Sequence, residues 1–235
     1  MTRSASRTVA ILLPCVLGAV AIRCAPVDSD AATTTKVADT RTAPALPANA
    51  SAIAVAGLHL VVAPSGNEVR YRIREQLARV ELPNDAIGRT GQITGGIGVG
   101  ADGQIIPAES KFVVNVATLA SDRSMRDNYV RRRLLETDQF PTVEFTATSF
   151  RGLPKTLPTS GAHTFDVIGN LTVHGVTKPT NWNVTAELKN GQLTGTASTL
   201  FTFADFNLDQ PHVPIVLSVN DTIRLEYDFA LVPKS

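Results

Sequence analysis

The sequence predicts an all-β protein, an antiparallel barrel or sandwich, with one α-helix inserted near residues 122–136. Apolar and polar residues alternate in several segments, and this period of two is typical of strands with one buried and one solvent-facing side. Turn-forming Gly, Pro and Asn residues separate these segments at short intervals, which favours antiparallel neighbours. About eight to ten such strands indicate a closed barrel or a two-sheet sandwich.

The first 21 residues are typical of a secretory signal peptide. Arg3 and Arg7 form a short basic region, and an apolar run follows over residues 9–22. This run is shorter than the roughly 18 to 20 residues that cross a bilayer, which argues against a permanent transmembrane helix. With residues 1–21 assigned as a signal peptide, we expect the protein to be exported, either to the periplasm or out of the cell.

Both cysteines of the chain, Cys15 and Cys24, lie in this N-terminal region. The rest of the chain therefore has no disulfide, no cysteine-ligated metal and no thiol nucleophile. Cys24 is the one position where a lipid anchor is considered, and membrane contact is expected only through such an anchor. Ile22 and Arg23 precede it, whereas a bacterial lipoprotein signal has small residues there, so lipidation is the minor alternative.

Residues 22–51 are rich in Ala, Thr and Pro and contain no aromatic residue. A segment of this kind buries too little apolar surface to offset its ordering entropy, so we expect a disordered tether. The first aromatic residue is Tyr71, and every Phe, Tyr and Trp lies from there onward. The folded domain is therefore expected to span residues 52–235.

Strands are expected at regular intervals along this domain. Val69, Tyr71 and Ile73 alternate with three arginines, the clearest example of the pattern. In the Gly-rich stretch 88–103, glycines are expected to mark bulges or barrel bends. The expected strands cover residues 58–63, 69–73, 92–99, 112–117, 143–148, 165–173, 182–188, 193–203 and 222–231.

One segment departs from the period of two. Residues 124–136 contain no Gly or Pro, and apolar residues such as Val130 and Leu134 fall at helical spacing. We therefore expect a helix of about three turns. Ser121 or Asp122 is in position to cap its start.

Composition and motifs exclude several functional classes. The chain has 22 Lys and Arg residues against 21 Asp and Glu residues. It therefore lacks the basic excess that nucleic-acid-binding proteins usually have. The four histidines show no metal-ligand spacing, and there is no nucleophile elbow, phosphate-binding loop or dinucleotide fingerprint. The sequence therefore predicts a non-enzymatic protein without catalytic residues, metal or cofactor.

Two blocks of sequence carry a family resemblance. The first covers residues 121–145 and includes Arg126-Asp127 and a Phe-Pro-Thr-Val-Glu-Phe segment at 140–145. The second, residues 169–179, reads Gly-Asn-Leu-Thr-Val-His-Gly-Val-Thr-Lys-Pro. Together they resemble the YceI-like family of bacterial extracytoplasmic proteins, over about residues 56–233. Asn170 departs from the family pattern, which has Asp at this position.

The resemblance implies a lipocalin-like antiparallel β-barrel of about eight strands, capped by a helix. It also implies that an apolar lumen holds a long isoprenoid lipid, either a polyprenyl chain or a quinone tail. Inward-facing residues of the strands would then line the lumen. The candidates are Val114, Val116, Val143, Phe145, Phe165, Val167, Trp182, Val184, Leu225, Tyr227 and Phe229.

Arg126 and His174 are the candidates for contacting a polar head group at the mouth of the barrel. The alternative roles are structural: Arg126 pairs with Asp127 to fix the helix, and His174 bonds within its own turn. Two alternative functions also stay open. In the first, the barrel is filled by side chains and the protein is a stress-related or interaction protein that uses its outer surface and binds no lipid. In the second, the protein is a hydrolase or isomerase that uses His174 with a nearby acid. A homodimer is a further open alternative.

Overall fold

The structure is a computed structural model that describes residues 57–154, 157–158 and 160–234. The expected signal peptide (1–21), the tether (22–51) and Cys24 lie outside the described residues. Among the residues described, no helix is both long and apolar enough to span a membrane.

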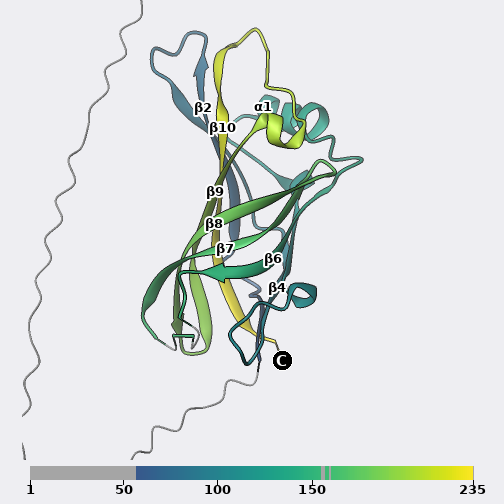
Figure 1. Ribbon diagram of the computed structural model, residues 1–235. Coiled ribbons are helices and arrows are strands. Elements are labelled where there is room, and N and C mark those ends of the chain that lie inside the picture. Colours follow the sequence, from purple (N-terminus) through teal and green to yellow (C-terminus); the bar gives the residue numbers. More distant parts are fainter. Residues whose placement is uncertain (1–56, 155–156, 159, 235) are drawn as a thin grey trace, which may run out of the picture. The chain divides into compact units, whose positions relative to one another are not determined.

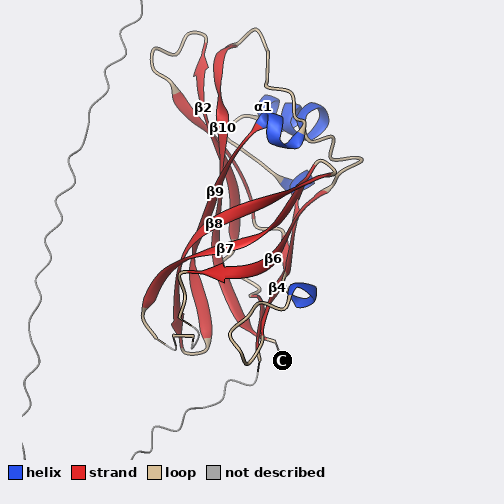
Figure 2. Ribbon diagram, viewed as in Figure 1, coloured by secondary structure: helices blue, strands red, loops and turns tan. Residues whose placement is uncertain are grey.

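The described residues form ten strands and one short α-helix, α1 (Ser124–Tyr129). Figures 1 and 2 show the strands surrounding a common interior, with α1 near one end. The strands are β1 (Leu58–Val62), β2 (Glu68–Leu77), β3 (Asn84–Thr90), β4 (Ile93–Val99), β5 (Lys111–Asn115), β6 (Thr142–Arg151), β7 (Ala162–Val173), β8 (Val176–Lys189), β9 (Gln192–Thr202) and β10 (Val216–Pro233).

The sheet closes on itself as a barrel. Its order is β1-β4-β5-β6-β7-β8-β9-β10, every pair is antiparallel, and β1 pairs again with β10, with Val61 opposite Val232. β2 pairs with the earlier part of β10, and β3 pairs with β2. The expected all-β, antiparallel barrel of about eight strands is confirmed, because eight strands complete the closed ring.

The sequence did not predict β3. Its residues lack a run of alternating large apolar side chains, and Gly88 stands where a side chain would face the interior. A Cβ atom at Gly88 would lie 2.3 Å from the Tyr71 ring, on the opposing position of β2. The Tyr71 ring therefore fills the interior beside Gly88. As a result, β3 itself lacks the alternation of apolar and polar side chains that would have predicted a strand.

The helix is shorter than the expected 122–136. After α1 the backbone continues as a π-helical turn over Val130–Leu134, where the Leu135 N–H donates to the Val130 carbonyl at 2.8 Å. This wider turn buries Val130 while leaving Arg132 and Arg133 exposed. Periodicity alone did not reveal the π turn, because Val130 and Leu134 are also compatible with α-helical spacing.

The start of the helix also differs from the expected cap. Arg123 occupies the N-cap position, and its side chain makes no capping hydrogen bond. Instead, the Asp127 carboxylate accepts hydrogen bonds from the Ser121 backbone N–H at 2.8 Å and from its hydroxyl at 2.6 Å. A carboxylate in the first turn is also favoured by the helix dipole.

Arg70, Arg72 and Arg74, the arginine row of β2, pair with acidic side chains of neighbouring strands. Glu226 of β10 accepts from Arg70 Nε at 2.5 Å and from Arg72 Nε at 3.4 Å. Asp85 of β3 accepts from both Arg72 and Arg74 at 3.1 Å. These cross-strand pairs join β2 to the strands on both of its sides.

The arginine row makes stability depend on pH. Burial alone would raise the pKa of Glu226, but hydrogen bonds from Arg70 and Arg72 outweigh it and hold the pKa below its usual range. Hydrogen bonds from Arg74 and Arg72 likewise lower the pKa of Asp85. A lowered folded-state pKa means that the unfolded chain takes up these protons first. The stabilisation is therefore complete at neutral pH and is lost as pH falls below about 5.

We expect Glu226→Gln to lower the free energy of unfolding by about 1 kcal/mol at neutral pH, with little difference from the wild type in acid. Urea unfolding across pH measures both effects. Glu187→Gln is the matched control, because Glu187 is an exposed acid of β8. A Glu226→Gln protein with the same pH dependence as the wild type would contradict the prediction.

Candidate ligand-binding site in the barrel lumen

Two cavities lie inside the barrel. The lower chamber has a volume of about 200 Å³ and reaches Leu188 and Leu193, beside the β8–β9 turn. The upper chamber has a volume of about 750 Å³ and reaches α1 and the β9–β10 connection, including Met125 and Ile215. Because Met125 and Ile215 are exposed, the upper chamber extends to the protein surface.

The two chambers meet at a collar formed by Val69, Val114, Val143 and Leu225, which line both of them. Val114 and Val143 lie opposite each other on β5 and β6. Val69 and Leu225 come from the neighbouring strands β2 and β10. The two chambers therefore adjoin each other inside the barrel. An interior with this much open space does not agree with the alternative of a filled barrel.

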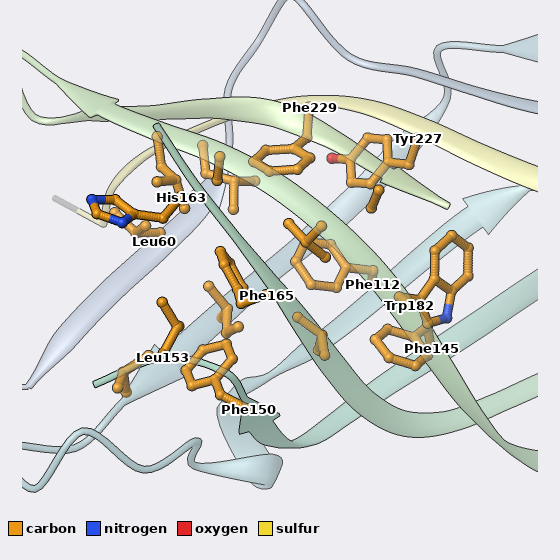
Figure 3. Close-up of a pocket in the computed structure, with 18 of the residues that line it drawn as sticks. Leu60, Phe112, Phe145, Phe150, Leu153, His163, Phe165, Trp182, Tyr227 and Phe229 are labelled. Carbon is orange, nitrogen blue, oxygen red and sulfur yellow. The ribbon is translucent and has the colours of Figure 1, made fainter. Parts of the chain in front are cut away.

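The structure places all eleven candidate lumen residues on the walls of these chambers. Val114, Val143 and Leu225 line both, and Val116 lines the upper one. The seven others line the lower chamber: Phe145, Phe165, Val167, Trp182, Val184, Tyr227 and Phe229. Figure 3 shows this chamber and labels the aromatic residues among them.

Strand glycines make room for the large inward rings. A Cβ atom at Gly169 would lie 2.6 Å from the Phe145 ring, and one at Gly195 would lie 2.8 Å from the Phe229 ring. The Phe145 ring thereby reaches Trp182 at a centroid distance of 5.5 Å, although β7 separates their strands. The absence of side chains at these glycines lets aromatic rings lie along the wall rather than fill the lumen.

Polar groups concentrate at the wall of the upper chamber. Arg126 of α1 pairs with Glu75 of β2 at 2.6 Å and also with Asp122. The Arg126 and Glu75 side chains are only 12% and 7% exposed. Burial raises the pKa of the nearby Tyr71 phenol to about 12, so Tyr71 is neutral at physiological pH. Arg126 therefore lies where a head group was expected, but its charge already has two acidic partners.

His174 lies on the wall of neither chamber. It occupies the β7–β8 turn with a positive φ of 50°, and its Nε2 is 3.0 Å from a Glu136 carboxylate oxygen. Its ring also packs against Phe140 at a centroid distance of 4.4 Å. The geometry therefore links the His174 turn to Glu136 and Phe140 of the segment after the helix, and not to the lumen; the bond within its own turn that the sequence suggested is not the contact observed. The histidine–acid contact considered for catalysis exists, but it lies outside both chambers.

Sequence reasoning missed several residues that line the lumen, among them Tyr71 and Phe112. Both alternate with solvent-facing residues in strands that the sequence predicted, and both line a chamber. Their spacing of two residues from Val69 and Val114, which puts each pair on one face of its strand, was the signal that would have identified them. Among the described residues, no group of three His, Cys, Asp or Glu side chains is arranged to hold a metal ion.

The fold and the site define a class of protein: a closed antiparallel barrel with a mainly apolar lumen and a charged cluster near one end. Residues 60–231 match the YceI-like domain, and the chain belongs to the YceI-like family. UPF0312 proteins from two strains of Pseudomonas putida are 32% identical to it over 114 residues. That match covers 45% of this chain and 56% of each relative, so the chain matches just over half the length of these curated relatives.

Two solved structures share the fold. A polyisoprenoid-binding domain from Saccharophagus degradans, implicated in plant cell wall breakdown, is 13% identical with a TM-score of 0.55. The likeness covers 75% of this chain and 99% of that domain. BcnA from Burkholderia cenocepacia is 16% identical with a TM-score of 0.52, over 72% of this chain and 98% of BcnA. At these identities the likeness establishes the fold.

Proposed function

We propose that this protein is an extracytoplasmic binding protein that holds a long isoprenoid lipid, a polyprenyl chain or quinone tail, in its lumen. The four wall residues that the two chambers share carry the proposal, because they place two mainly apolar spaces next to each other along the path of an extended chain. Membership of the YceI-like family and the polyisoprenoid-binding domain of the same fold support the choice of ligand.

Burial of hydrocarbon supplies the binding energy in this proposal. The upper chamber alone lies within the range of about 300 to 1,000 Å³ that is usual for small-molecule sites. Each buried methylene-sized group contributes about 0.8 kcal/mol, so several isoprene units outweigh the entropic cost of association. Binding and release without catalysis are sufficient for this role. Export to the periplasm or the medium is part of the proposal and is based on residues 1–21.

Native mass spectrometry of the gently purified protein tests the proposal, because it reports ligand mass and oligomeric state together. We expect a co-purifying isoprenoid, and uptake of added solanesyl phosphate by the lipid-free protein. Ala197→Phe, which adds a ring at the lower chamber, is expected to weaken that uptake at least about tenfold.

Thr196→Phe is the matched control, because the adjacent Thr196 side chain is exposed on the outside of the barrel. It is expected to bind solanesyl phosphate as the wild type does. A protein that co-purifies with no lipid and does not bind the added probe would refute the proposed function.

A further inference from the structure

Two aromatic rings meet across the lumen just beside the collar. Phe112 of β5 and Tyr227 of β10 have ring centroids 6.2 Å apart, with an interplanar angle of 67°. Their strands are not neighbours, because β1 and β4 lie between them in the sheet. The contact therefore spans the interior of the barrel rather than following its wall. Both side chains line the lower chamber and point into it in Figure 3.

One of the two rings is anchored. The Tyr227 hydroxyl donates a hydrogen bond to Asn67 Oδ1 at 2.8 Å, and the Ala230 backbone N–H donates to the same oxygen at 3.0 Å. The Asn67 amide in turn donates to the Ala63 carbonyl at 2.9 Å. Asn67 thus fixes Tyr227 to the β1–β2 connection. Phe112 carries no polar group, so only packing positions its half-buried ring.

The two chambers differ in chemistry as well as in size. The upper chamber includes the Glu75–Arg126 pair and has a volume of about 750 Å³. The lower chamber, about 200 Å³, is lined mainly by aliphatic and aromatic side chains. A ligand with a polar head therefore fits with its head in the upper chamber and its tail directed toward the rings of Phe112 and Tyr227.

We propose that Phe112 and Tyr227 form a gate that makes the lumen selective for chain length. A short isoprenoid chain is accommodated in the upper chamber, whereas a long chain must displace the Phe112 ring to reach the lower chamber. Asn67 is a positioning residue that keeps Tyr227 in place while Phe112 moves. This inference rests on the proposed function, because it concerns how the same lumen distinguishes its ligands.

Trp182 gives the gate a direct readout. It is the only tryptophan of the chain, and it lines the lower chamber. Its ring contacts Phe145, the residue opposite Phe112 in the sheet, so its fluorescence reports a chain that enters the lower chamber at the gate. We expect solanesyl phosphate to change this fluorescence slowly, because a required conformational change lowers the association rate. Geranyl phosphate, detected by native mass spectrometry, is expected to bind without a comparable fluorescence change.

Phe112→Ala removes the mobile ring. We expect it to raise the association rate of solanesyl phosphate about tenfold, because the chain no longer has to displace the ring; tenfold in rate corresponds to about 1.4 kcal/mol of barrier. The affinity for geranyl phosphate is expected to stay unchanged, because Phe112 does not line the upper chamber. Phe112→Leu, which preserves apolar packing, is expected to give a smaller increase and serves if the alanine variant does not fold. Tyr227→Phe, which removes only the bond to Asn67, is also expected to increase the rate.

Phe150→Ala is the matched control. Phe150 also lines the lower chamber, but its contact with Phe165, at 5.7 Å, joins the adjacent strands β6 and β7. Because Phe150 contacts the tail in the lower chamber, its loss is expected to weaken the affinity for solanesyl phosphate through faster release and to leave the association rate unchanged. The gate is refuted if both probes bind, both change Trp182 fluorescence at equal rates, and Phe112 variants behave like Phe150→Ala. Failure of both probes to bind would instead overturn the proposed function, and the gate with it.

Discussion

Replacing Arg126 with alanine is expected to lower the free energy of unfolding by about 2 kcal/mol. The Glu75 carboxylate, 7% exposed, then loses its partner at 2.6 Å and is left as an uncompensated charge at the chamber wall. Breaking a fully buried pair costs about 3 to 5 kcal/mol, and the adjoining open volume reduces the expected loss. Urea unfolding monitored by the far-ultraviolet signal measures the difference.

A double variant separates the charge effect from the loss of packing. Arg126→Met with Glu75→Leu removes both charges, and we expect it to recover most of the stability, because apolar replacements of a buried pair are often neutral. Arg132→Ala serves as the control, because Arg132 lies on the same helical segment but is exposed. Equal effects of Arg126→Ala and Arg132→Ala would show that the contact with Glu75 does not stabilise the fold.

Gly88→Ala is expected to destabilise the protein by about 2 kcal/mol, within the usual range for overpacking. The three atoms nearest to an added Cβ all belong to the Tyr71 side chain, at 2.3, 2.6 and 2.8 Å. Gly88 does not have a positive φ, so the strain is one of space rather than of backbone conformation. The substitution must therefore displace the Tyr71 ring from its place beside the upper chamber.

This explanation requires strong coupling between the two positions. In a Tyr71→Ala background, Gly88→Ala is expected to be nearly neutral, and a double-mutant cycle measures the difference. Gly91→Ala is a control of the same chemistry with a much milder contact, because the nearest atom to its added Cβ, the Asn67 carbonyl oxygen, is 3.3 Å away and needs to shift by only a few tenths of an ångström. If Gly88→Ala costs as much without the Tyr71 ring as with it, the steric explanation is wrong.

The period of two was sufficient to predict most strands and to select residues that line the lumen. In an antiparallel strand, alternate side chains face opposite sides, so Val114 and Val143 identified the inner face of β5 and β6. The same rule failed for β3, because Gly88 has no side chain and the Tyr71 ring of β2 occupies the inward-facing space at that position. The arginine row of β2 follows the rule too, with its partners on the neighbouring strands.

Other features depend on contacts between distant residues and do not follow from local pattern. The position of His174 in the sequence places it at a turn, but only the contact with Glu136 shows that its side chain is engaged outside the lumen. The open volume is equally hidden, because an inward Phe145 either fills a barrel or lies along its wall. Gly169, on the neighbouring strand, provides the space that decides this.

The pairing of β10 also constrains the order in which the domain folds. β10 is the last barrel strand in chain order, yet it hydrogen-bonds to β9, β2 and β1. Until β10 has been synthesised and docked, the edges of these strands lack their partner and the lumen is not enclosed. Such contacts between distant parts of the sequence slow folding. The interior of the barrel is therefore enclosed only when the last strand of the domain docks, so the lumen is a product of the final step of folding.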